Sequence, residues 1–270
     1  MWPPAPTACT GSTPDRASAR NERRVVKDWP YPRWIGHRGA GRLAPENTLA
    51  AFRLGAEHGY RMFECDAKLS QDGVVFLMHD ATLERTTSGH GTGGSQPWQA
   101  LSQLDAGAWH SRRWAGEPLP TLAALARWCL ANGHLLNIEI KPTPGTERET
   151  GEVVAREAAR LWAGAGVPPL LSSFKPEALA AARAAAPGLP RALLLDSLRE
   201  GWLEEALRLD CVAIVCNHAL WDAGTVARVR QAGLRQLSYT VNDEWAAQRL
   251  IDLGTDGIIT DRVDLFSPGA

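Results

Sequence analysis

Two histidines of the chain, His37 and His79, lie in short polar clusters, and a spaced pair of carboxylates, Glu64 and Asp66, lies between them. Imidazole has a pKa close enough to neutral to accept or donate a proton at physiological pH. Cleavage of a phosphodiester needs a base that activates the attacking hydroxyl or water and an acid that protonates the departing alkoxide. The two histidines are therefore candidates for an acid–base pair acting on a phosphate ester.

A third carboxylate, Glu139, stands with Lys141 at the end of the apolar run over residues 134–140. Residues two apart in a strand project to the same side, so Glu64 shares a face with Asp66. Three converging carboxylates repel each other unless a cation lies between them, and ligands that are all oxygen suit Mg²⁺, Ca²⁺ or Mn²⁺ better than zinc. We therefore expect a metal site here, although a surface salt bridge would explain an isolated Glu-x-Asp pair.

Two cations accompany these groups. Arg38 follows His37 directly, and its planar guanidinium can bind two phosphate oxygens at once. Lys141 can stabilise the negative charge that builds up in the transition state. A salt bridge to Glu139 is the alternative role for Lys141, and both roles are compatible. The residue types thus describe a site for a phosphate ester held by a divalent metal.

From Trp34 onward, short apolar runs alternate with helical patterns rich in alanine and leucine. The apolar runs predict strands near residues 34–37, 61–66, 74–78, 134–140, 169–174, 191–195, 211–215, 235–241 and 256–260. The helical patterns predict helices near residues 47–58, 120–131, 147–164, 175–186, 201–208, 222–232 and 243–252. This alternation indicates an α/β fold with a parallel sheet.

Eight parallel strands fit a closed (β/α)8 TIM barrel, for which about 250 residues are usual. A doubly wound sheet is the alternative, but the glycine fingerprint expected after its first strand is missing. The run near 74–78 leads into a polar stretch instead of a helix, so we interpret residues 81–118 as an insertion on one rim of the barrel.

The barrel would bring the polar residues to one place. His37 is predicted to end the first strand, Glu64 and Asp66 the second, and Glu139 and Lys141 the strand near 134–140. The carboxyl ends of barrel strands open on a single face, where catalytic groups are assembled. We therefore expect these side chains to meet at one mouth of the barrel.

Composition excludes several classes of protein. The length of 270 residues suits one large domain as well as two small ones, and a hydrophobic share of 44% allows a sizeable core. Lys+Arg 29 against Asp+Glu 30 leaves almost no net charge. No basic block is present, so a nucleic-acid surface is not expected, and no apolar run approaches the roughly 18 residues of a membrane span. Residues 1–28 have no apolar core of a secretory signal and are interpreted as a flexible extension before a catalytic domain over 29–270.

The five cysteines are widely dispersed and contain no Cys-x-x-Cys pair. They are Cys9, Cys65, Cys129, Cys211 and Cys216. Four of them fall in segments that look apolar and structured, which favours buried free thiols in a reducing compartment. We expect a cytoplasmic protein.

The order and spacing of the polar motifs resemble the glycerophosphodiester phosphodiesterases, in particular the bacterial cytoplasmic type. The matching motifs are His37-Arg38-Gly39, Pro45-Glu46-Asn47-Thr48, Glu64-x-Asp66, Asp72-Gly73, His79-Asp80, Arg85-Thr86-Thr87, Asn137-Ile138-Glu139-Ile140-Lys141, Ser172-Ser173-Phe174, Thr240-Val241-Asn242 and Asp256-Gly257-Ile258-Ile259-Thr260-Asp261. The resemblance covers residues 33 to 266. It implies a TIM barrel with an inserted segment that hydrolyses glycerophosphodiesters to sn-glycerol 3-phosphate and an alcohol.

The resemblance also implies roles for single residues. By matching positions, it makes Glu64, Asp66 and Glu139 the ligands of a Mg²⁺ or Ca²⁺ ion, His37 and His79 the acid–base pair, Arg38 and Lys141 the phosphate-binding residues, and Glu46 a residue that lines the site or orients a ligand. We interpret His37 as the base and His79 as the acid. Tyr239 departs from the family, in which a tryptophan often precedes Thr-Val-Asn, and this puts the substrate preference in doubt.

Three other functions are compatible with parts of this pattern. A phosphodiester sensor would keep the fold without catalysis, but all the catalytic residue types are present. A Schiff-base lyase would use Lys141, which a neighbouring Glu139 should keep charged and poorly nucleophilic. A phospholipase acting on membrane lipids would need an anchor that the sequence does not show. The partner we expect is a small glycerophosphodiester substrate.

Overall fold

The structure is a computed structural model that describes residue 1 and residues 29–268. The predicted extension, with Cys9, lies outside the described residues apart from Met1. The strands are β1 (Trp34–Gly36), β2 (Met62–Leu69), β3 (Val75–Leu77), β4 (Leu135–Ile140), β5 (Leu170–Ser173), β6 (Arg191–Leu195), β7 (Ala213–Asn217), β8 (Arg235–Tyr239) and β9 (Gly257–Thr260). The α-helices are α1 (Leu49–Glu57), α2 (Trp98–Leu101), α3 (Leu122–Asn132), α4 (Glu147–Leu161), α5 (Pro176–Ala185), α6 (Trp202–Arg208), α7 (Ala223–Gln231) and α8 (Glu244–Asp252).

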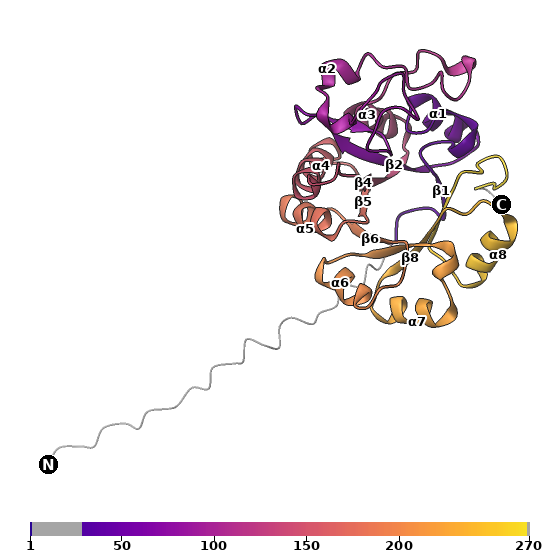
Figure 1. Ribbon diagram of the computed structural model, residues 1–270. Coiled ribbons are helices and arrows are strands. Elements are labelled where there is room, and N and C mark those ends of the chain that lie inside the picture. Colours follow the sequence, from indigo (N-terminus) through magenta and orange to yellow (C-terminus); the bar gives the residue numbers. More distant parts are fainter. Residues whose placement is uncertain (2–28, 269–270) are drawn as a thin grey trace.

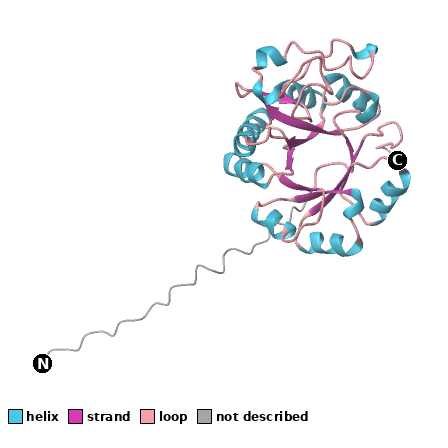
Figure 2. Ribbon diagram, viewed as in Figure 1, coloured by secondary structure: helices cyan, strands magenta, loops and turns pink. Residues whose placement is uncertain are grey.

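The sheet is a closed barrel. β1 pairs in parallel with both β2 and β9, which joins the two ends of the parallel sheet, while β3 pairs antiparallel with the last residues of β2. Figures 1 and 2 show the strands in the centre and the helices around them. The predicted TIM barrel is confirmed, and the doubly wound alternative is wrong.

Side chains of the strands alternate between two apolar layers. In β2, Phe63 and Cys65 point outward into the layer beneath the helices, whereas Met62 belongs to the cluster that fills the barrel interior. This inner cluster includes Ile35, Leu170, Leu194, Val215, Leu237 and Ile259. Because successive strand residues face opposite sides, Glu64 and Asp66 project into the barrel above Met62.

The prediction that Glu64 and Asp66 end their strand was wrong, because β2 continues to Leu69. The extra residues pair with β3, with Ala67 opposite Leu77 and Leu69 opposite Val75. The predicted convergence still holds, since Asp66 lies opposite Glu139 in the parallel pairing of β2 with β4. The antiparallel hairpin thus prolongs β2 without moving its carboxylates away from the mouth.

The predicted insertion lies between β3 and α3, drawn as magenta loops in Figure 1. It contains α2 and the short 3-10 turns Gly93–Ser95 and Arg112–Trp114. A small apolar cluster packs the segment against β3 and the residues that flank it, and it is formed by Phe76, Met78, Leu83, Leu101, Ala106 and Leu119. The segment is therefore a packed excursion, in which Trp98 contacts the small apolar cluster while Trp109 is exposed.

Most helix ends follow the expected signals. Thr121 and Asp222 are the predicted N-caps, and their side chains accept hydrogen bonds from Ala124 N and Thr225 N. Pro176 occupies the first turn of α5. Among the described residues, no helix combines the length and apolar character that crossing a membrane requires.

Candidate active site

Three inward-facing carboxylates, Glu64 and Asp66 of β2 and Glu139 of β4, meet at the mouth of the barrel. Each offers an oxygen within 4.8 Å of the oxygens of the other two, and all three residues are buried. Glu64 Oε1 and Asp66 Oδ1 are buried without a hydrogen-bond partner among the described residues. Converging carboxylate oxygens that lack a hydrogen-bond donor fit a hard divalent cation, so the donor set agrees with the predicted metal site.

The charges of this cluster are not balanced within the protein. Burial raises the pKa of Glu64 well above its usual value, and the neighbouring carboxylates raise it further. Burial and the charge of Asp66 likewise raise the pKa of Glu139 to about 7, against the effect of Lys141. Burial would also raise the pKa of Asp66, but the charges of Arg38 and Lys141 outweigh it and lower that pKa. A bound cation would relieve the repulsion that remains.

Arg38 connects the end of β1 to the carboxylates. Its backbone has φ 51, an uncommon value for a residue other than glycine, and its N–H donates to Glu64 Oε2 at 3.1 Å. The guanidinium lies 3.1 Å from Asp66 Oδ2 through Nε and donates to Glu46 Oε1 at 2.9 Å through Nη1. Asn47, which the sequence analysis gave no role, donates to Asp66 Oδ2 at 2.8 Å.

His37 is oriented by a carboxylate from the last strand. Its Nδ1 lies 2.6 Å from Asp261 Oδ1, and Asn242 donates to the other carboxylate oxygen at 2.9 Å. A carboxylate accepts only, so Nδ1 carries the proton and Nε2 keeps its lone pair when the ring is neutral. Nε2 lies beside the carboxylate cluster, 3.8 Å from Glu64 Oε2. His37 is thus arranged to accept a proton at Nε2.

His79 has a carboxylate partner of its own. Its Nδ1 lies 2.7 Å from Asp80 Oδ1, and Arg85 donates to both oxygens of Asp80. Arg85 also donates to both oxygens of Glu46, so the start of the insertion is tied to the residue that holds Arg38. Burial lowers the pKa of His79, as do the charges of Arg38 and Lys141, against the opposing charge of Asp66.

Lys141 follows β4 and contacts the carboxylates. Its ammonium donates to Glu139 Oε1 at 2.7 Å and lies 3.7 Å from Asp66 Oδ1. Lys68, on the same face of β2 as Asp66, donates to the Lys141 carbonyl at 2.9 Å. The expected salt bridge of Lys141 is therefore present, and it holds the ammonium at the edge of the carboxylate cluster.

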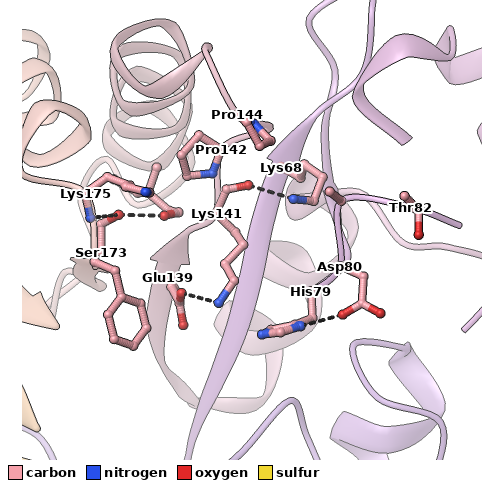
Figure 3. Close-up of a pocket in the computed structure, with 13 residues that line it drawn as sticks. Lys68, His79, Asp80, Thr82, Glu139, Lys141, Pro142, Pro144, Ser173 and Lys175 are labelled. Atoms are coloured by element: carbon pink, nitrogen blue, oxygen red, sulfur yellow. Dashed lines mark hydrogen bonds and ion pairs between the residues drawn. The ribbon is translucent and has the colours of Figure 1, made fainter. Parts of the chain in front are cut away.

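Two cavities meet at this cluster and share His79, Glu139, Lys141 and Phe174 in their linings. The inner cavity, about 170 Å³, is lined also by His37, Arg38, Glu64, Asn137, Leu194, Tyr239, Thr240 and Ile259. The outer cavity, about 510 Å³, is lined also by Lys68, Asp80, Ala81, Thr82, Ile140, Pro142, Pro144, Ser173 and Lys175. Figure 3 shows the outer cavity, with Lys141 between Glu139 and His79.

The structure brings all eight predicted site residues to one mouth. His37, Arg38, Glu64, His79, Glu139 and Lys141 line the inner cavity, while Glu46 and Asp66 bind the Arg38 guanidinium behind it. Five further residues contact the predicted ones without having been predicted from the sequence: Asp261, Asn242, Arg85, Asn47 and Lys68. The first four belong to the sequence motifs that resemble the family, and Lys68 is two residues from Asp66. Their positions in or beside these motifs could have identified them as site residues.

Comparisons with known proteins give one consistent result. Residues 37–265 match the Glycerophosphoryl diester phosphodiesterase family. A glycerophosphodiester phosphodiesterase of Caldanaerobacter subterraneus is 32% identical over 84% of this chain and 93% of its own. The structure of an Oleispira antarctica phosphodiesterase in complex with the product sn-glycerol-3-phosphate is similar at 34% identity and a TM-score of 0.80, over 85% of this chain and 93% of that one.

A glycerophosphodiester phosphodiesterase from Agrobacterium tumefaciens gives the same picture at 31% identity and a TM-score of 0.74, over 88% of this chain and 99% of that one. The family match spans both candidate histidines and all three carboxylates. Fold, site and comparisons therefore agree that the chain belongs to the glycerophosphoryl diester phosphodiesterase family.

Proposed function

We propose that the protein hydrolyses glycerophosphodiesters to sn-glycerol 3-phosphate and an alcohol, with His37 and His79 as its acid–base pair. The observation that carries the proposal is the position of the two imidazoles beside the buried carboxylate cluster, each with Nδ1 held by its own carboxylate. The product complex of the similar Oleispira antarctica phosphodiesterase supports the choice of product.

Glu64, Asp66 and Glu139 would hold the divalent metal, Mg²⁺ or Ca²⁺. Such an ion polarises a phosphoryl oxygen as a Lewis acid and offsets negative charge. Arg38 and Lys141 would bind the phosphate oxygens from the rim of the carboxylate cluster. Asp66 and Glu46 orient the Arg38 guanidinium at 3.1 and 2.9 Å, so its remaining N–H groups are available to an anion.

The two cavities support an order for the histidines. His37 lines the inner cavity, whereas His79 lines both, so His79 lies on the side from which an alcohol can leave. His37 Nε2 takes the proton of the nucleophile as the oxygen of the nucleophile bonds to phosphorus. The nucleophile is water or the glycerol hydroxyl of the substrate, and in the second case water then opens the cyclic phosphodiester to give sn-glycerol 3-phosphate. His79 Nε2 gives a proton to the alcohol oxygen as its bond to phosphorus breaks. The negative charge of the bound phosphodiester favours the protonated form that this step needs.

Histidine substitutions test this order. We expect His79→Ala to lower kcat/KM for glycerophosphocholine by at least about a hundredfold, the lower end of acid–base catalysis. With an ester of p-nitrophenol the loss should be much smaller, since phenolate leaves without a proton. His37→Ala should lose activity on both esters. Unchanged turnover of glycerophosphocholine by His79→Ala would refute the assignment, and the inverse pattern would exchange the two roles.

Removal of the metal tests the carboxylate site. Chelation should abolish hydrolysis, and addition of Mg²⁺ or Ca²⁺ should restore it, because three buried carboxylates repel each other and the phosphate without a cation. Product release is measured with glycerophosphodiesters of choline, ethanolamine, glycerol and inositol. Full activity in excess chelator would contradict the metal site, and absence of product from every ester would favour the sensor function.

A further inference from the structure

Three of the four lysines of the chain line the outer cavity. The chain has 29 basic residues, and its lysines are Lys27, Lys68, Lys141 and Lys175. Lys68, Lys141 and Lys175 come from β2, from the end of β4 and from the turn before α5, and all three contribute to this one lining. Figure 3 shows them around the cavity, with Lys175 on the side of Ser173 and Lys68 nearer to His79 and Asp80. Their convergence gives the cavity a cationic wall.

The two acidic residues of the same lining, Asp80 and Glu139, already have cationic partners. Asp80 accepts two hydrogen bonds from Arg85 and one from His79. Glu139 binds Lys141 at 2.7 Å and belongs to the carboxylate cluster. Lys68 is a charged side chain with 1% exposure and uses one N–H on the Lys141 carbonyl. Glu139 offsets the charge of Lys141, so an anion in the cavity would meet chiefly Lys68 and Lys175, to which no carboxylate of this lining is hydrogen-bonded.

A quaternary ammonium group would find little to bind there. Such cations are recognised by aromatic faces. Apart from His79, Phe174 is the single aromatic residue among the described residues of this lining, and the Lys141 ammonium already lies over its ring, 5.4 Å from the centroid. The cavity wall thus repels a cationic group and offers it no aromatic cage.

The sizes of the two cavities indicate which half of a substrate each cavity would hold. The inner cavity, about 170 Å³, suits the constant glycerol, whereas the outer cavity, about 510 Å³, can hold an alcohol of variable size. We propose that the outer cavity selects leaving alcohols that carry an anionic group of their own, with a phosphate as the best match, over cationic alcohols such as choline. This inference rests on the proposed function and names its substrate class.

Three substrates that differ in the charge of the leaving alcohol test the proposal. They are glycerophosphocholine, glycerophosphoglycerol, and glycerophosphoglycerol with a terminal phosphate, and the loss of the diester phosphorus resonance measures hydrolysis of each. At low salt, kcat/KM should rise in that order, by at least about tenfold from first to last. One partly exposed ion pair between a lysine and the substrate raises kcat/KM by up to about fivefold, and more than one lysine lines the cavity. Added salt should reduce the difference.

Variants of Lys175 separate charge from packing. Lys175→Gln should lower kcat/KM for the phosphorylated substrate by about fivefold and so reduce its advantage over choline, whereas Lys175→Arg should keep the wild-type ratio. The matched control is Arg127→Gln, which removes an exposed charge of α3 outside both linings and should leave the ratio unchanged.

The outcomes distinguish this inference from the proposed function. Wild-type enzyme that hydrolyses glycerophosphocholine as well as the phosphorylated substrate would overturn the inference and leave the proposed function intact. Equal losses on all three substrates in Lys175→Gln would overturn it as well. Failure of the wild type to hydrolyse any of the three, with metal present, would overturn both.

Discussion

Each candidate histidine has a carboxylate on the Nδ1 side of its ring, and the two carboxylates are held differently. Asp261 accepts from His37 and from Asn242, and burial, which would raise its pKa, is outweighed by these hydrogen bonds and by Arg38, so the pKa falls to about 2. Asp80 is held by Arg85, whose hydrogen bonds lower its pKa despite partial burial. Both carboxylates therefore stay ionised at neutral pH and orient the imidazoles by accepting a hydrogen bond from Nδ1.

We expect Asp261→Asn to lower kcat by about 10- to 100-fold with a small change in KM. The carboxylate accepts from both His37 and Asn242, but an amide has one acceptor oxygen, so one of the two donors must face an N–H. The ring of His37 then loses its orientation, a change that costs roughly this much at comparable supporting residues. Steady-state kinetics with glycerophosphoglycerol measure the effect.

The control for this prediction is Asp256→Asn at the other end of β9, where the carboxylate binds Gln236 N and Arg235. That variant should keep the wild-type kcat. Equal losses in the two variants would show that Asp261 acts through stability alone.

The Asp261 carboxylate should also make the stability of the wild-type protein depend on pH. The pKa of Asp261 falls from 3.8 to about 2 on folding, so its stabilisation is complete above the unfolded value and disappears as pH falls through the folded value. The free energy of unfolding should therefore drop by about 2 kcal/mol more in wild type than in Asp261→Asn between about pH 5 and pH 2. Urea unfolding at several pH values measures this difference, and parallel curves would contradict it.

The spacing of charged residues predicted the candidate site, but not the contacts that orient it. Glu64 and Asp66 could be assigned to one face from their separation alone. His37 and Asp261 are 224 residues apart, and only closure of β1 against β9 brings them together. Arg85 lies in a loop, where no periodicity indicates which way a side chain points. Such tertiary contacts have no local signal in one sequence.

At the scale of elements, the strands were predicted well because each is a short buried apolar run. All nine expected strands are present, with ends that differ by a few residues. The main error is β2, whose last residues are stabilised by pairing with β3, a non-local contact that the pattern of β2 does not contain. The helix α2 was missed because its four residues are too few to show a period.

The contact between α4 and α5 can be tested at Gly151. A Cβ atom there would overlap the backbone of Ala178, including its carbonyl oxygen. We expect Gly151→Ala to lower the free energy of unfolding by about 1–2 kcal/mol, because overlap with backbone atoms should cost about 2–3 kcal/mol, the upper part of the overpacking range, against a gain of about 1 kcal/mol in helix propensity. Thermal and urea unfolding measure the change.

Gly166→Ala is the matched control for this contact. A Cβ at Gly166 meets no heavy atom within 4 Å, and the variant should unfold like wild type. A Gly151→Ala protein as stable as Gly166→Ala would show that α4 can move away from α5 at no net cost, and that the helices do not set each other's position.

At the scale of the whole molecule, the apolar layer between the barrel and its helices buries thiols in two separate clusters. The predicted buried free cysteines are confirmed for the described residues: Cys65 and Cys129 lie in one apolar cluster, and Cys211 and Cys216 in another. Burial raises the pKa of Cys129, Cys211 and Cys216 to about 12, and it raises the pKa of Cys65 as well. Since the thiolate is the reactive form, these groups should be inert while the barrel is closed.

We expect a Cys9→Ser variant to show no reaction with an aromatic disulfide reagent at pH 8, and four reactive thiols in guanidinium chloride. Because the two pairs lie in different clusters, the order of labelling in mild denaturant also reports how the barrel opens. A barrel that closes through β1 on both sides should open as a unit and expose all four thiols at one rate. If two thiols react well before the other two, the halves of the barrel open separately. A thiol that reacts in the native state would contradict the burial itself.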